Sequence, residues 1–177
     1  MDVTRAFLPH LRRTAYSAEK HSVGIINVSS GIGVYTIPTC SLYAASKFAV
    51  EGFTEALSYE LTSQNIDAKL VIPHGGITQT SFQHRAAQEA AKSDAEVNAA
   101  YQDFLAKSMA TMGRMMAATK TTSDEVAQTI FESATDGKDT LRYWIGNDWR
   151  GFFKFKFGEK GLKADEEYVA AMRKYFA

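Results

Sequence analysis

VGIINVSS, residues 23–30, opens the stretch of sequence that decides the fold. Its apolar part, residues 23–28, has the length and continuity of a strand that is buried on both faces of a parallel sheet. Residues 41–63 then place apolar side chains at three- and four-residue steps, which predicts a helix. AKLVI at residues 68–72 predicts a second strand, closed by Pro73 and two glycines. Strand, helix and strand in this order predict a βαβ unit.

The segments on either side of this unit continue the same alternation. Residues 2–13 have helical spacing of their apolar side chains, and residues 80–118 predict a long helical excursion rich in alanine and methionine. Ser123, followed by two acidic residues, predicts the start of a helix that ends near residue 136. Residues 141–145 predict a third strand, and residues 166–176 a short final helix. The chain is therefore expected to be a single α/β domain over residues 1–177, with a doubly wound parallel sheet and flanking helices.

Composition excludes several classes of function. Twenty basic residues balance twenty acidic ones, so the chain has no excess positive charge with which to bind nucleic acid or an anionic membrane surface. The single cysteine cannot form an internal disulfide, which fits a reducing cytosol, and the apolar runs are too short to cross a bilayer. We expect a cytoplasmic protein. The absence of net charge also weakly favours association of copies, and a homo-oligomer is expected.

Three polar side chains are the candidates for chemistry. Ligands of doubly wound sheets bind beyond the carboxyl ends of the strands, and Ser30 directly follows the first predicted strand. Tyr43 opens the following helix, and Lys47 stands four residues later on the same face. An ammonium at this position stabilises the phenolate form of tyrosine, which would make the pair a usable general acid or base near neutral pH.

Each of these residues also has a purely structural interpretation. A tyrosine and a lysine four positions apart on a surface helix commonly make only a packing contact, and serines at a strand end commonly serve in turns and caps. His74 is the histidine nearest this predicted site. Because the four histidines are not spaced as metal ligands with a carboxylate or cysteine, the sequence predicts no metal.

Four segments together resemble the short-chain dehydrogenases and reductases, in their shorter-chain branch. They are NVSSGIG at residues 27–33, YAASK at 43–47, PHGGITQT at 73–80 and LRYWIG at 141–146. The resemblance covers nearly the whole chain, but only the C-terminal part of the family's domain. It implies a Rossmann-like sheet that is incomplete in this chain.

The resemblance also implies roles for the candidate residues. Tyr43 would exchange a proton with the oxygen of an alcohol or carbonyl substrate while hydride passes to or from NADP or NAD. Lys47 would assist the phenol and hydrogen-bond the nicotinamide ribose, and Ser30 would hold the substrate oxygen. Val34, Tyr35 and Ile37 would contribute to the substrate pocket, which implies a small-molecule substrate with apolar parts.

The loop after the second strand would cover the nicotinamide. His74 departs from the family's proline-glycine pair, as if one residue were inserted, so the threonine that contacts the carboxamide is left open. The cofactor-binding residues implied by the resemblance, besides Tyr43 and Lys47, are Pro73, Gly75, Gly76, Ile77, Thr78 and Thr80.

The family's glycine-rich, pyrophosphate-binding turn is not found in this sequence. Gly31 and Gly33 do not supply it, because Thr36 stands where a third glycine is needed. Residues 1–177 are therefore interpreted as the C-terminal portion of a Rossmann-type oxidoreductase domain that lacks the glycine-rich N-terminal half. The residue that chooses between NAD and NADP would also lie upstream.

Two other functions remain open at this point. The chain could be a truncated, non-catalytic dimerisation or binding module, since the family commonly pairs through the helices that correspond to residues 2–13 and 41–63. An isomerase or dehydratase that uses the same tyrosine is a smaller possibility.

Overall fold

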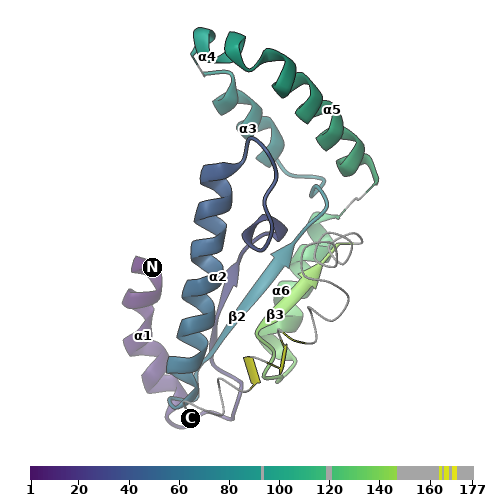
Figure 1. The fold of residues 1–177 in the computed structure, drawn as a ribbon. Coiled ribbons are helices and arrows are strands. Elements are labelled where there is room, and N and C mark those ends of the chain that lie inside the picture. Colours follow the sequence, from purple (N-terminus) through teal and green to yellow (C-terminus); the bar gives the residue numbers. More distant parts are fainter. Residues whose placement is uncertain (93, 119–120, 147–163, 165, 168, 171–177) are drawn as a thin grey trace.

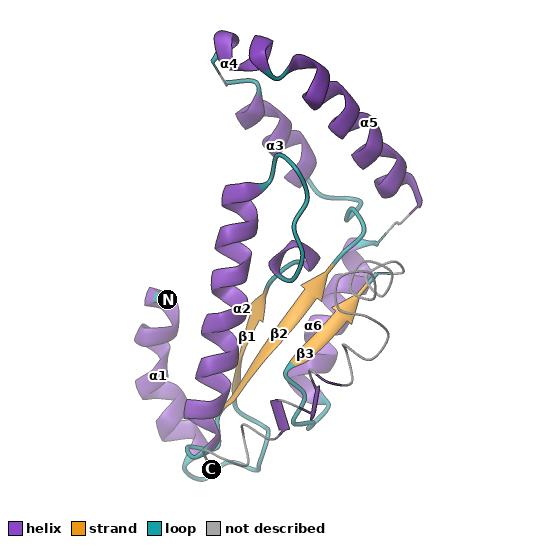
Figure 2. Cartoon of the chain, viewed as in Figure 1, coloured by secondary structure: helices purple, strands orange, loops and turns teal. Residues whose placement is uncertain are grey.

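The computed structural model describes residues 1–92, 94–118, 121–146, 164, 166–167 and 169–170, with the side chains of 115–118 excepted. Its centre is a parallel sheet in the order β1 (Gly24–Val28), β2 (Asp67–Pro73) and β3 (Arg142–Ile145) (Figure 2). Asn27 pairs with Leu70 across the first ladder, and Leu70 with Arg142 across the second. The predicted α/β fold with a parallel sheet is confirmed.

One face of the sheet is covered by α2 (Ser41–Thr62), the helix of the predicted βαβ unit. Ala68 of β2 packs with Leu57 and Leu61 of this helix, and α1 (Asp2–Ala15) adds Ala15 to the same apolar cluster. Figure 1 shows α1 running alongside α2. Leu61 is 1% exposed, and burying a leucine side chain contributes about 1.5–3 kcal/mol. This cluster fixes the helix whose first turns carry Tyr43 and Lys47.

The other face of the sheet is covered by α6 (Ser123–Thr135). Side chains alternate between the faces of a strand, so Lys69 points away from α2. Its buried Nζ donates to the main-chain O of Ser133 at 2.9 Å and to Asp136 Oδ1 at 3.3 Å. A buried ammonium thus binds the last turn of α6, where main-chain carbonyls have no partners within the helix.

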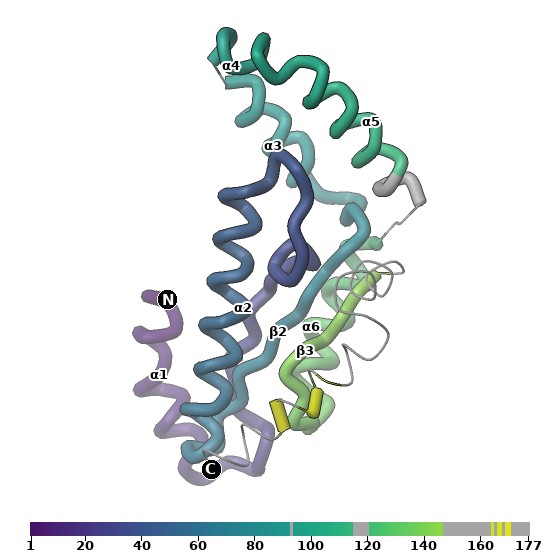
Figure 3. Tube along the Cα trace, in the orientation of Figure 1, coloured from purple at the N-terminus to yellow at the C-terminus, as the bar shows by residue number. Residues whose placement is uncertain are grey.

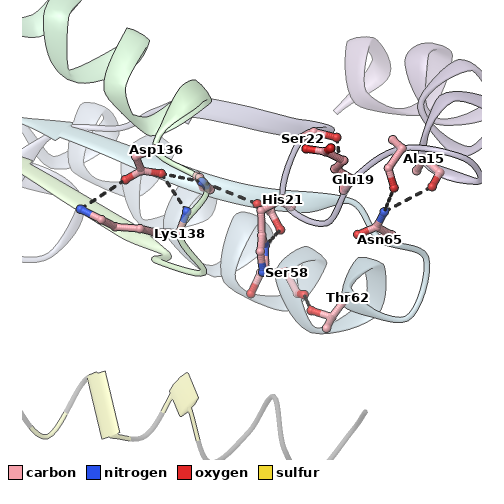
Figure 4. Close-up of polar contacts among 12 residues, drawn as sticks. Ala15, Glu19, His21, Ser22, Ser58, Thr62, Asn65, Asp136 and Lys138 are labelled. Carbon is pink, nitrogen blue, oxygen red and sulfur yellow. Dashed lines mark hydrogen bonds and ion pairs between the residues drawn. The ribbon is translucent and has the colours of Figure 1, made fainter.

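Asp136 is the carboxylate at the centre of this contact. Burial pushes its pKa up, but hydrogen bonds from the main-chain N of Lys138 (3.0 Å) and Tyr143 Oη (2.8 Å), with the charge of Lys69, outweigh burial. The pKa of Asp136 therefore lies below its ordinary value. Burial and the bond to Asp136 raise the pKa of Tyr143. Figure 4 shows Asp136 and Lys138 in this cluster.

A buried ion-pair cluster joins β3 to α2. Arg142 Nε lies 3.2 Å from Glu51 Oε2, and a second guanidinium nitrogen of Arg142 bonds Glu55. The side chains of Arg142 and Glu51 are only 10% and 7% exposed. Because α2 also carries Tyr43 and Lys47, these ion pairs help to fix the position of β3 relative to the candidate site.

Asn65 joins α1 to the turn between α2 and β2. Its φ of 56° lies in the left-handed region, where asparagine is tolerated better than most residues. Its Nδ2 donates to the main-chain O of Ala15 at 3.3 Å and of Ala18 at 3.2 Å (Figure 4). The last carbonyl of α1 and one carbonyl of the loop after it are satisfied in this way, at the end of the sheet opposite the candidate site.

The prediction that the first strand is buried on both faces is wrong. β1 lies at an edge of the sheet and its residues are half-buried or exposed, whereas β2 is buried almost throughout. Val28, for example, is 43% exposed. A strand at the edge of the described sheet has a neighbour on one side only, so one flank of its side chains and main chain lies open.

The predicted helical excursion is confirmed as three successive helices. They are α3 (Phe82–Ala90), α4 (Ala95–Ala100) and α5 (Gln102–Ala118). They extend past the carboxyl ends of the strands as an arm, which Figure 3 traces from residue 82 onward. The side chains of α3 and α4 are exposed throughout. This arm lies over the end of the sheet where the candidate site residues stand.

The remaining helices follow their predicted positions. Thr122 and Glu125 form a capping box that starts α6 where Ser123 predicts a helix. Of the predicted final helix, Glu166, Glu167, Val169 and Ala170 are helical, and the rest of residues 166–176 lies outside the described residues. Within the described part of the chain, no helix has the length and apolar character needed to span a membrane.

Candidate functional site

Ser30 lies at the carboxyl end of β1, where the chain leaves the sheet. The main-chain N of Ser29 still bonds Val71 O at 2.8 Å, and a short 3₁₀ helix, Gly31–Gly33, begins directly after Ser30. Ser30 caps this turn, its Oγ accepting from the main-chain N of Ile32 at 3.4 Å. The bond is long, so the half-buried hydroxyl keeps capacity for another partner.

Tyr43 and Lys47 share one face of α2, as their spacing predicts. Lys47 Nζ lies 5.8 Å from the centroid of the Tyr43 ring. The same ammonium donates to the main-chain O of Val28 at 3.1 Å, two residues before Ser30. Lys47 therefore links the ring of Tyr43 to the carboxyl end of β1, and Ser30 follows that end in the chain.

The surroundings of Lys47 change the pKa of its ammonium group. Burial lowers the pKa of Lys47, and the carboxylate of Glu51, one helical turn later, partly raises it again. The pKa remains below its ordinary value. A half-buried ammonium held between a main-chain carbonyl and a phenol ring is well placed to donate hydrogen bonds to a ligand.

Phe82 forms an aromatic contact with the candidate acid or base. The ring centroids of Phe82 and Tyr43 are 5.9 Å apart, with the planes tilted by 48°. Phe82 is the first residue of α3 and is 53% exposed. The arm therefore begins against Tyr43, which gives the site one apolar wall. The sequence analysis did not single out Phe82, although it starts the helical excursion.

The loop after β2 requires its glycines. Gly75 and Gly76 have φ of 92° and 64°, in the left-handed region that glycine adopts without strain. Gln79, with φ of 64°, is a non-glycine residue in the same region. The loop therefore turns sharply between Pro73 and Thr80, close to the end of the neighbouring β1.

Thr121 fastens this loop, and the sequence analysis missed it. Its Oγ1 donates to His74 O at 2.5 Å, and its own main-chain O accepts from Thr78 N at 2.8 Å and Thr78 Oγ1 at 3.3 Å. Ile77 pairs with Thr121 in an isolated parallel bridge. The Thr78 hydroxyl is thus engaged by the protein, whereas Thr80 is exposed. The only sequence signal for Thr121 is its place before the capping residue of α6.

His74 is held by the protein on its side chain as well as on its main chain. The hydroxyl of Tyr35 hydrogen-bonds the His74 ring, with Oη 2.8 Å from Nε2 and also in contact with Nδ1. Tyr35 is only 6% exposed. The hydroxyl of Tyr35 thus binds the loop after β2, and Val34 and Ile37 are half-buried; the expected place of these three residues in a substrate pocket stays a prediction.

Two other features carry no functional conclusion. His21, Asp67 and Asp139 have ligand atoms within 4.8 Å of one another and could hold a cation. However, Asp67 already lies 2.9 Å from His21 Nδ1 and 3.6 Å from buried Lys69 Nζ, so its charge is compensated. A cavity of ≈ 500 Å³ beside the start of α6 is lined by none of the predicted site residues.

Comparisons with known proteins agree with this geometry. The sequence profile described as short chain dehydrogenase matches residues 1–91. An uncharacterized oxidoreductase of Schizosaccharomyces pombe is 34% identical over 149 residues, which are 83% of this chain and 56% of the relative. The putative oxidoreductase SadH of Mycobacterium tuberculosis is 36% identical over 125 residues, which are 71% of this chain and 41% of that protein.

A solved structure supports the fold. A short-chain dehydrogenase from Streptomyces avermitilis superposes with a TM-score of 0.61 and 19% identity, over 97% of this chain and 55% of that one. The chain thus spans about half the length of the relatives that it matches. The resemblance is expected from the sequence to cover nearly the whole chain, but the family profile stops at residue 91. The uncharacterized oxidoreductase YusZ of Bacillus subtilis, 33% identical, aligns over 91% of the chain. With its parallel sheet and its matched residues 1–91, the chain belongs to the short chain dehydrogenase family.

Proposed function

We propose that this chain carries the substrate end of an oxidoreductase that uses NADP or NAD to interconvert an alcohol and a carbonyl compound. The observation that supports the proposal is the position of Lys47, which links the Tyr43 ring to the carboxyl end of β1, from which Ser30 follows in the chain. Lys47 Nζ reaches Val28 O at 3.1 Å while it lies 5.8 Å from the Tyr43 ring centroid.

The residues present fit the nicotinamide half of such a cofactor. The loop from Pro73 to Thr80 is built on two left-handed glycines and is fastened by Thr121, a stable surface for a flat ring. Pro73, Gly75, Gly76, Ile77 and either Thr78 or Thr80 would contact it, with Thr80 the more accessible hydroxyl. Bound there, the cofactor supplies or accepts the hydride.

The chain's own residues handle the proton. Tyr43 Oη donates a proton to the carbonyl oxygen during reduction, or accepts one from the alcohol during oxidation. Lys47, whose ammonium lies 5.8 Å from the centroid of the phenol ring, would place its positive charge near the phenol during proton transfer and would donate to the nicotinamide ribose. The Ser30 hydroxyl donates to the substrate oxygen and stabilises the charge that develops on it.

The substrate is proposed to be a small molecule with apolar parts. The aromatic contact between Phe82 and Tyr43 supports this, because it puts an exposed phenyl ring beside the proposed proton donor. A cytoplasmic homo-oligomer is the proposed form of the protein, supported by the balanced charge of the chain.

The test compares Tyr43→Phe with wild type in the intact protein. Loss of the hydroxyl should lower kcat by about 10²–10⁴-fold, the usual contribution of a general acid or base. The dissociation constant for NADPH or NADH, measured by nicotinamide fluorescence, should stay within about threefold of wild type, because the ring remains. Tyr16→Phe, the same change at a tyrosine that is 95% exposed, is the matched control and should leave both quantities unchanged.

Two outcomes contradict the proposal. Turnover by Tyr43→Phe within about tenfold of wild type would mean that the phenol is not the acid or base. Failure of the intact protein to bind either nucleotide would favour a non-catalytic binding module instead.

A further inference from the structure

The main chain of His74 is held by hydrogen bonds to two segments that come later in the sequence. Its N–H donates to Ile145 O at 3.0 Å, and its carbonyl accepts from Thr121 Oγ1 at 2.5 Å. Gly146 lies so close that a Cβ there would stand 2.4 Å from His74 O. The His74 main chain therefore has little room to move, and its imidazole projects from a fixed point.

That imidazole contacts the turn after Ser30. A Cβ added to Gly31 would lie 2.6 Å from His74 Nδ1 and 2.8 Å from Tyr35 Oη. The main chain of Gly31 is thus packed directly against the ring and the hydroxyl. Gly31 is the residue after Ser30, so the position of the imidazole limits the position of Ser30.

Tyr35 holds the turn to the ring. The rings of Tyr35 and His74 meet edge to face, with centroids 5.3 Å apart and planes at 81°, and the hydroxyl bonds a ring nitrogen. Tyr35 N also bonds Gly31 O at 3.3 Å. The turn is closed on itself by the main chain and is fastened to the loop after β2 by one side-chain pair.

We propose that Tyr35 and His74 act as a pair of positioning residues that hold Ser30 at a fixed place relative to the loop after β2. The inference rests on the proposed function, because it assigns the pair a role in placing the hydroxyl that binds the substrate oxygen. A hydroxyl stabilises developing charge only when it is held close to its productive position, and a small displacement is costly. The pair supplies that restraint without contacting the substrate.

Tyr35→Phe is the central test, since it removes the hydroxyl but keeps the buried ring. In the intact protein we expect kcat to fall about tenfold, because the His74 ring loses its hydrogen bond to the Tyr35 hydroxyl and the turn loosens. Nucleotide affinity should change less than about twofold, since the hydrogen bonds between Thr121 and the loop remain. His74→Gln, which keeps a hydrogen-bonding side chain, should lose less activity than His74→Leu.

A Ser30→Ala background separates positioning from general damage. If the pair acts through Ser30, Tyr35→Phe should lower kcat by less than about twofold in a protein that already lacks this hydroxyl. A merely structural effect would lower kcat by the same factor in both backgrounds, and that result would overturn the proposal.

Hydrogen exchange tests the restraint without any assay of turnover. Tyr35→Phe should speed exchange of the main-chain amides of residues 33–35 and leave those in α6 unchanged. Unchanged exchange at residues 33–35 would overturn the proposal even if the protein proves to be an active enzyme. If exchange quickens but wild type shows no nucleotide-dependent turnover, the proposed function fails and the assignment of the pair to catalysis falls with it.

Discussion

Gly33 ends the turn that follows Ser30, and we expect Gly33→Ala to lower the free energy of unfolding by about 1–3 kcal/mol, the usual cost of overpacking. The added methyl group would lie 2.9 Å from Ser29 Oγ and 3.1 Å from both Glu51 Cγ and the main-chain O of Lys47. The serine hydroxyl can rotate away, but the carbonyl is fixed in α2. The turn and the helix must therefore move apart, by a few tenths of an ångström.

The same movement should affect activity, because it separates Ser30 from Lys47. We expect kcat to fall about tenfold in the intact protein. Urea unfolding followed by far-ultraviolet circular dichroism measures the stability, and the slope of the transition shows whether the folded state is otherwise unchanged.

Two glycines provide controls for the same substitution. A Cβ at Gly52 or Gly113 meets no atom within 4 Å, and both lie within helices. Gly52→Ala and Gly113→Ala should therefore raise the free energy of unfolding by about 0.5–1 kcal/mol. If Gly33→Ala is as stable as these two variants, the tight approach of the turn to α2 is not present in solution and the reasoning is refuted.

Two further substitutions test the contacts that hold the sheet to its helices. Arg142→Met should lower the free energy of unfolding by about 3–5 kcal/mol, because it removes the guanidinium that pairs with the buried charge of Glu51. Arg142→Lys keeps a positive charge and should lower the free energy of unfolding by clearly less. Equal urea midpoints for the two variants would contradict this. Asp136→Asn should cost about 1.5–3 kcal/mol at neutral pH, the scale of a hydrogen bond to a charged group. The pKa of Asp136 is lowered in the folded protein, so its contribution is present above the ordinary carboxyl pKa and is lost as the pH falls below about 4. Unfolding curves should therefore converge for wild type and Asp136→Asn in acid, and a constant difference at every pH would rule out this account.

The sequence predicted the contacts that lie within one element and missed those between elements. Tyr43 and Lys47 were placed together correctly because helix geometry alone puts residues four apart on one face. The start of α6 at Ser123 and the break of the chain at Gly75 and Gly76 also follow from local rules, although the capping residue itself is Thr122. Such features depend on near neighbours in the chain, and local sequence is enough to find them.

Contacts between distant segments need the tertiary structure. Thr121 fastens Thr78 across a separation of 43 residues, and no periodicity relates the two. The burial of β1 was misjudged for a similar reason, because an apolar run indicates a strand but not how many strands lie beside it. The resemblance places Tyr35 at a substrate pocket, but nothing in the local sequence indicates that its hydroxyl bonds a histidine 39 residues away.

The hydrogen bonds of Thr121 affect how the segment between Thr78 and Thr121 can vary in sequence. The chain leaves the loop after β2 at Thr78 and returns to it at Thr121, so the three helices between them start and end at one closed base. We expect that their length and sequence can vary while the hydrogen bonds of that base stay in place. If the proposed function holds, exchange of this one contiguous segment should change substrate preference and leave the loop after β2 intact.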